Sequence, residues 1–115
     1  MNEFLLIFRN TTIPEGKYSP EEIQGIMKQW ENWMGNMAAQ NKLISIGSRL
    51  SPEGLTLKPN NVITNGPYTE IKEIVGGYTL IRADSLEDAA EIAKGCPILN
   101  VGGSVEVRAQ VPVNG

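Results

Sequence analysis

The stretch NGPYTEIKE at residues 65–73, followed by VGGY at residues 75–78, carries the most structural information in this chain of 115 residues. Its first part has the composition of a tight turn, because proline suits the second turn position and Gly66 relieves the crowding that proline imposes on its predecessor. Its second part opens a strand with two glycines, which weaken a strand unless another group comes close. The pattern predicts a polar turn beside a strand that a ligand, or the backbone of a second copy, approaches. The alternative is a turn with a bulge and no ligand.

Strands and helices alternate on either side of this stretch. Continuous apolar runs are typical of strands covered on both faces, and alternating runs are typical of half-buried strands. Strands are predicted at residues 4–8, 43–50, 74–83 and 104–111, with a short hairpin at residues 55–57 and 62–64.

Two helices are predicted, each with a serine N-cap. The first begins after Ser19 with a proline and a capping box, and its apolar residues recur at spacings of three and four as far as about residue 41. The second begins after Ser85. Gly25 and Gly35 each cost the first helix about 1 kcal/mol relative to alanine, which predicts close packing at both. The tryptophans and methionines of this helix could form a ligand box, but their spacing favours the core.

The order β-α-β-hairpin-β-α-β predicts one α+β domain over residues 1–115, a ferredoxin-like βαββαβ fold with an extra short hairpin. Right-handed crossovers place both helices on one face of an antiparallel sheet. Both alternating faces of the strands at residues 4–8 and 74–83 are apolar, so a monomer would leave an apolar sheet face in water. Packing two such faces as a twofold pair buries roughly 800 Å² per partner in a standard interface. The sequence therefore predicts a homodimer.

Composition excludes several functions. A formal charge of −3 at pH 7 argues against nucleic acid, which calls for a basic face. The first apolar run is too short to cross a bilayer and lacks the flanks of a secretion signal, so no membrane partner is expected. Cys96 cannot form an internal disulfide, which predicts a cytoplasmic location, and with no histidine to activate it we expect a small buried group. No metal or other cofactor is expected, since no carboxylate cluster has ligand spacing.

Three segments resemble the DGPF proteins of the YCII-related superfamily: NGPYTEIKE at 65–73, GGY at 76–78 and GGSVEVR at 102–108. The family pattern is DGPF-x-E-x-KE, then GGY, then GG-x-VEVR. The resemblance covers nearly the whole chain and implies a dimeric α+β barrel of ferredoxin-like subunits. Members are often encoded beside alternative sigma factors, which implies a regulatory protein as a partner in transcription.

Two departures from this pattern bear on catalysis. Asn65 stands where the family has aspartate, and Tyr68 stands where it has phenylalanine. In YCII-type relatives a His–Asp pair is the proposed catalytic unit. This chain has no histidine, and an asparagine amide is not basic near neutral pH. The pair therefore does not transfer to this chain.

The candidate ligand-binding residues are those of the turn and the polar side chains expected near it: Asn65, Gly66, Pro67, Tyr68, Arg49, Arg9 and Tyr78. An arginine at a strand end can hold an anion through two hydrogen bonds. Tyr68 and Glu70 are the candidate catalytic residues, because burial near an arginine could shift the pKa of either. The alternative for the acidic part of this stretch is a solvated run of charges.

Three functions remain open on the sequence alone. The first is non-catalytic binding of a small polar or anionic ligand, or of a protein, near residues 65–68. The second is a proton-transfer enzyme that uses Tyr68, Glu70 or Arg49 in the dimer cleft. The third is a regulatory interaction module related to transcription, although no segment is typical of a DNA-binding element.

Overall fold

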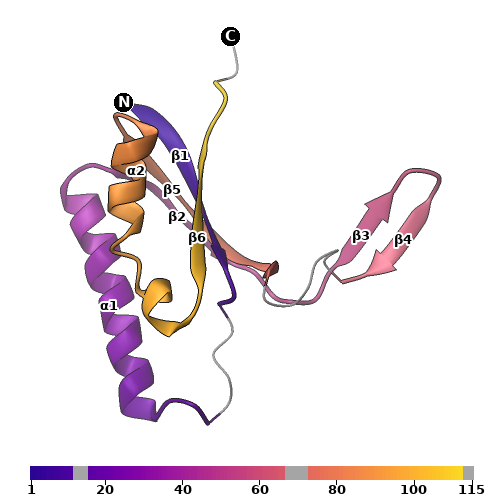
Figure 1. The fold of residues 1–115 in the computed structure, drawn as a ribbon, viewed down its shortest axis with the longest axis horizontal. Helices are drawn as coiled ribbons and strands as arrows, with labels where there is room; N and C mark the ends of the chain where they lie inside the picture. Colours follow the sequence, from indigo (N-terminus) through magenta and orange to yellow (C-terminus); the bar gives the residue numbers. More distant parts are fainter. Residues whose placement is uncertain (12–15, 67–72, 113–115) are drawn as a thin grey trace.

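A computed structural model describes residues 1–11, 16–66 and 73–112, and shows a four-stranded sheet, two helices on one of its faces, and a separate hairpin (Figure 1). The elements in order are β1 (Asn2–Arg9), α1 (Pro20–Ala39), β2 (Leu43–Arg49), β3 (Leu55–Lys58), β4 (Val62–Asn65), β5 (Val75–Ala83), α2 (Leu86–Ala93), the 3-10 helix η2 (Pro97–Val101) and β6 (Ser104–Ala109). The predicted ferredoxin-like α+β fold with an extra hairpin is confirmed. The dimer remains a prediction.

The four-stranded sheet is antiparallel, with strand order β2-β5-β1-β6. Phe4 lies opposite Ile81 and Leu6 lies opposite Thr79, and all four side chains are buried under the helices. The helix Trp33 packs on this core and donates from Nε1 to the carbonyl oxygen of Ile92 in α2, at 3.0 Å. This bond ties the two helices together above the sheet.

The opposite face of the sheet is covered by no element of the described chain (Figure 1). Side chains alternate along a strand, so Leu5, Ile7 and Leu80 project from this face, where they are half-buried by one another. Tyr78 joins them and is 38% exposed. We call this surface, carried by β1, β5 and β6, the open face.

Both helix starts form as predicted. Ser19 Oγ accepts from the Glu22 amide at 3.1 Å, and the Glu22 carboxylate accepts from the Ser19 amide at 3.0 Å, which completes the capping box. Ser85 caps α2 by accepting through Oγ from the amide of Asp88 at 3.1 Å. Helix α1 ends two residues before the predicted end, and Asn41, with a φ of 58°, lies in the left-handed region.

The prediction of close packing at two glycines of α1 is wrong, and strand β2 is irregular. A Cβ added at Gly25 or Gly35 would have no neighbour within 4 Å, so neither glycine marks a site of close packing. Strand β2 does not keep a simple alternation, because Gly47 has a φ of 77° and the pairing of β2 with β5 shifts on both sides of Ser45. The 3-10 helix η2 was not predicted from the sequence.

The hairpin of β3 and β4 extends away from the rest of the fold (Figure 1). Its turn contains Asn60 and Asn61 with φ of 67° and 62°, a conformation that asparagine tolerates better than most residues. The projection makes the chain extended: its radius of gyration is 15.9 Å, against about 13 Å for a compact domain of this length. No helix among the described residues is long and apolar enough to span a membrane.

Candidate functional site

A cavity of about 600 Å³ lies between the N-terminal half of α1 and the sheet, at the end of β2 and the start of β5. Its wall on α1 is mostly apolar and consists of Ile23, Ile26, Met27, Trp30 and Met34, together with Glu31. Met27 is 59% exposed, whereas Met37, farther along the same stripe, is buried. The prediction that the whole Trp and Met stripe packs in the core is therefore correct only for its C-terminal half.

Aromatic rings support the cavity from the side of the core. Phe8 on β1 meets Trp30 edge to face, with ring centroids 5.2 Å apart, and Trp30 meets Trp33 at 5.7 Å. Phe8 and Trp30 line the cavity, and Ile98 and Val101 of η2 complete this apolar surface. Edge-to-face aromatic pairs hold one another in fixed orientations. The cavity therefore has a preformed apolar surface.

Two of the predicted ligand-binding residues, Arg49 and Tyr78, line the cavity on the sheet side, although the side chain of Tyr78 projects from the open face. Arg49 is the last residue of β2 and lies opposite Gly77 in the ladder. Its side chain is exposed and has no hydrogen bond or ion pair with any residue in the ranges 1–11, 16–66 and 73–112. A guanidinium at the edge of an apolar cavity is available to bind an anionic group.

Neighbours in the same chain account for the two glycines of β5. A Cβ at Gly76 would lie 1.8 Å from Thr11 Oγ1, and a Cβ at Gly77 would lie 2.9 Å from the carbonyl oxygen of Ser48. Leu50 also donates from its amide to the carbonyl of Gly76 at 2.9 Å. The close approach predicted here is real, but neither a ligand nor a second copy is needed to explain it.

Arg9 is held by its own chain on the open face. Its Nη2 and Nε donate to Glu106 Oε1 at 3.1 and 3.3 Å, and Nη1 donates to the carbonyl of Glu73. Hydrogen bonds from Arg108 and then from Arg9 lower the pKa of Glu106 from its ordinary value. Arg9 does not line the cavity described above. A ligand could bind Arg9 only by replacing one of these partners.

The remaining predicted residues lie around the base of the hairpin or outside the described residues. Gly66 has a φ of 75°, its amide donates to the Gly54 carbonyl at 2.6 Å, and its carbonyl accepts from Thr56 Oγ1 at 2.9 Å. Asn65 is exposed at the end of β4 and does not line the cavity. The other predicted residues lie outside the described residues: Pro67, Tyr68 and Glu70.

The sequence model of the YCII-related domain matches residues 6–114. The chain belongs to the YCII-related family. The match extends from the middle of β1 to beyond the end of β6, so the family domain includes the sheet, both helices and the hairpin. The family predicted from the resemblance is thereby confirmed.

The YCII-related domain is also similar to a solved structure, the dehydrochlorinase TftG of Burkholderia phenoliruptrix AC1100. TftG acts on 5-chloro-2-hydroxyhydroquinone and its structure contains 2,5-dihydroxybenzoquinone. The two chains are 16% identical, with a TM-score of 0.46 over 98% of this chain and 95% of TftG. At this identity and TM-score the likeness carries no information about ligand or reaction. No curated protein sequence matches the chain.

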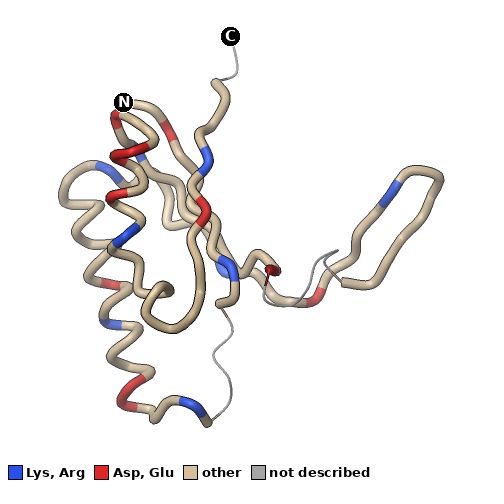
Figure 2. Tube along the Cα trace, viewed as in Figure 1, with Lys and Arg blue, Asp and Glu red and all other residues tan. Residues whose placement is uncertain are grey.

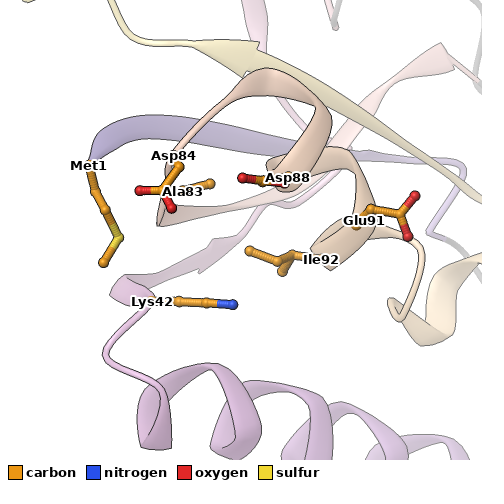
Figure 3. A pocket seen from close by; sticks show the side chains of 7 residues that line it. All are labelled: Met1, Lys42, Ala83, Asp84, Asp88, Glu91 and Ile92. Carbon is orange, nitrogen blue, oxygen red and sulfur yellow. The ribbon is translucent and has the colours of Figure 1, made fainter.

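A second hollow of about 430 Å³ lies at the opposite end of the sheet in this YCII-related domain. Figure 3 shows its seven lining residues: Met1, Lys42, Ala83, Asp84, Asp88, Glu91 and Ile92. Its three carboxylates lie on exposed residues of α2 and the turn before it. No group of His, Cys, Asp and Glu side chains in the described part of the chain is placed to hold a metal ion. The hollow is a shallow surface of mixed charge.

Cys96 has the buried, unreactive environment predicted from the sequence. Its side chain is 1% exposed in the core under the helices. Burial raises the pKa of the thiol to about 12, against a smaller opposite effect from a hydrogen bond with Ile98. A thiol that stays protonated at neutral pH is a poor nucleophile.

Sequence reasoning missed the apolar wall of the site. Helical spacing places Ile23, Met27 and Trp30 on one face of α1. Spacing alone does not tell whether the whole of that face packs on the sheet or only half of its length does. The signal available in the sequence is the set of glycines in the opposite wall, because Gly47, Gly76 and Gly77 all line the cavity.

Proposed function

We propose that this YCII-related domain binds a small organic anion with a flat apolar body in the cavity between α1 and the sheet. The observation that carries the proposal is a cavity of about 600 Å³ with an apolar lining and with Arg49 as the single cation among its described lining residues. Ligand sites commonly combine such a volume, about 300–1,000 Å³, with an apolar surface and a few polar groups.

Each part of the ligand has a counterpart among the lining residues. Phe8, Trp30 and the flexible Met27 would contact the apolar body, since aromatic rings and thioethers pack well against flat molecules. Arg49 would hold the anionic group through paired hydrogen bonds. Glu31 also lines the cavity and would oppose a second negative charge. The arrangement favours a monoanion.

This proposal keeps the predicted small anionic ligand and moves the centre of the site from the turn at residues 65–68 to the cavity at Arg49 and Tyr78. A proton-transfer enzyme that uses Tyr68 or Glu70 stays a prediction, and so do a regulatory protein partner and a cytoplasmic location. We also propose the homodimer. The apolar patch of Leu5, Ile7, Leu80 and Tyr78 on the open face supports it, beside the charged Arg9, Arg82, Glu106 and Arg108 of the same face.

Two fluorescent probes of similar shape test the proposal. The anion 1-anilinonaphthalene-8-sulfonate has a flat apolar body and one negative charge, and N-phenyl-1-naphthylamine is its neutral counterpart. Arg49→Gln should weaken binding of the anion about tenfold, equivalent to about 1.4 kcal/mol, and leave the neutral probe nearly unchanged. Arg108→Gln, an exposed arginine of β6 that does not line the cavity, is the matched control.

Equal binding of the anion by the wild-type protein and the Arg49→Gln variant would contradict the assignment of Arg49. Turnover of any bound compound that disappears on changing Tyr68 or Glu70 would instead favour the enzyme.

A further inference from the structure

The cavity between α1 and the sheet has a single carboxylate among its described lining residues, that of Glu31. Glu31 lies four residues after Met27 and three before Met34, and side chains at these separations are neighbours on the surface of a helix. Both methionines also line the cavity. Glu31 is the last charged residue of α1, since the other charges of this helix lie nearer its start (Figure 2). The wall of the cavity on α1 therefore holds one acidic group in an otherwise apolar surface.

The Glu31 carboxylate has no partner within the part of the chain that the structure describes. It makes no hydrogen bond or ion pair with any residue there, and in particular it does not pair with Arg49. An ionised carboxylate offers only hydrogen-bond acceptors. A ligand that reaches Glu31 therefore meets an acceptor that no described residue occupies.

The two charged residues that line the cavity belong to different walls. Arg49 is the last residue of β2, on the sheet side, and Glu31 lies on α1. A flat ligand that fills the space between these walls contacts both. Its anionic group bonds to the Arg49 guanidinium, so the part of the ligand that reaches α1 meets the opposite charge.

We infer that Glu31 selects ligands that carry a hydrogen-bond donor, a hydroxyl or an amine, at the end of the flat body remote from the anionic group. The inference rests on the proposed function of the cavity and names the ligand class as aryl monoanions with such a donor. A hydrogen bond to a charged acceptor is stronger than one between neutral groups, and a second anionic group would meet a like charge instead. Glu31 is exposed, so water limits both effects to roughly threefold to tenfold in affinity.

Three ligands with the same naphthalene ring test the selection by isothermal titration calorimetry. They are 6-hydroxy-2-naphthoate, which carries a donor, 6-methoxy-2-naphthoate, which does not, and the dianion 2,6-naphthalenedicarboxylate. The wild-type protein should bind the hydroxy compound about fivefold more tightly than the methoxy compound, and the dianion more weakly than either. Glu31→Gln should lower the preference for the hydroxyl to below about twofold and should strengthen binding of the dianion. A general loss of structure does not produce changes of opposite sign.

Glu21→Gln is the matched control, because Glu21 is an exposed glutamate in the first turn of the same helix and does not line the cavity. It should leave all three affinities unchanged. Equal binding of the hydroxy and methoxy compounds by the wild type, or a preference that survives Glu31→Gln, would overturn the role of Glu31. If Arg49→Gln still weakens the naphthoates in that case, the proposed function stands. A wild-type protein that binds none of the three ligands would overturn both.

Discussion

Trp30 and Phe8 meet edge to face beside the cavity, with ring centroids 5.2 Å apart and ring planes at 86°. Trp33, one turn later, is buried and bonded through Nε1 to the carbonyl of Ile92. The two tryptophans of the chain thus report on different places, one on the cavity and one on the core between the helices.

Quenching of tryptophan fluorescence by acrylamide should separate these two environments. The Trp33→Phe variant, with only Trp30, should be quenched several times more strongly than the Trp30→Phe variant, because Trp30 is half-buried at an open cavity. Trp33→Phe loses one hydrogen bond, at a cost of about 1 kcal/mol, and should remain folded. Equal quenching of the two variants would mean that the cavity is closed in solution.

Alanine at Gly25 or Gly35 should stabilise the domain by up to about 1 kcal/mol each, as measured by urea unfolding, because a Cβ at either position meets nothing and alanine favours the helix. Gly47→Ala is the contrasting control. Gly47 has a φ of 77°, and its Cβ would lie 1.9 Å from the Tyr78 carbonyl, so this variant should be strongly destabilised. A loss of stability at Gly25 would show that α1 is covered in solution.

Alanine substitutions at Gly76 and Gly77 should differ in whether a second substitution, at the residue that each new Cβ would meet, restores stability. Gly76→Ala should destabilise the domain by about 1–3 kcal/mol through overpacking, and Thr11→Gly in the same chain should recover most of that loss. Gly77→Ala should not be recovered by Ser48→Gly, because the atom in its way is the backbone carbonyl of Ser48. Equal rescue at both positions would contradict the packing of β2 on β5.

Acid should weaken the contacts of Arg9 through Glu106. The pKa of Glu106 is lowered in the folded state, so the folded state holds its proton less tightly than the unfolded chain. The stabilisation is present above the ordinary carboxyl pKa and is lost as the pH falls through the lowered one. The unfolding free energy of the wild type should therefore fall more than that of Glu106→Gln between about pH 5 and pH 3. Parallel curves would show that the two arginines do not hold this carboxylate in solution.

High pH should lower the stability of the fold through Cys96, whereas Glu106 lowers it at low pH. Its thiol pKa is raised to about 12, so the stabilisation is complete below the ordinary thiol pKa and is lost as the pH rises toward the raised value. Above about pH 8.5 the free energy of unfolding should fall by up to about 1.4 kcal/mol per pH unit relative to Cys96→Ala. The difference between the two proteins cancels the titration of lysines and tyrosines. A pH-independent difference would mean that solvent reaches the thiol.

Sequence patterns were sufficient for the parts of the fold that depend on local chemistry. The Ser19 capping box follows from neighbouring residues and was predicted correctly, and β6 also forms, although it ends at Ala109, two residues before its predicted end. The bulge at Gly47 and the 3-10 helix η2 depend on contacts between distant segments, such as Gly47 with Tyr78 and Gly103 with Ile98, which no local pattern contains.

The site could be predicted only in part for the same reason. Arg49 and Tyr78, two of the predicted ligand-binding residues, both line the cavity, and their part in binding a ligand stays a prediction. The opposite wall of the cavity comes from α1. The apolar spacing of this helix is the same whether its residues pack on a sheet or line a cavity, so the sequence does not distinguish the two.

The central claim, an anion site in the cavity between α1 and the sheet, is tested most directly by ¹⁵N-resolved NMR of the two tryptophan indoles during titration with 1-anilinonaphthalene-8-sulfonate. The account predicts that the Trp30 indole signal shifts with ligand, that the Trp33 signal bonded to Ile92 stays in place, and that Arg49→Gln weakens the titration. An unmoved Trp30 signal, with shifts confined to Leu5, Ile7 and Leu80 on the open face, would contradict it.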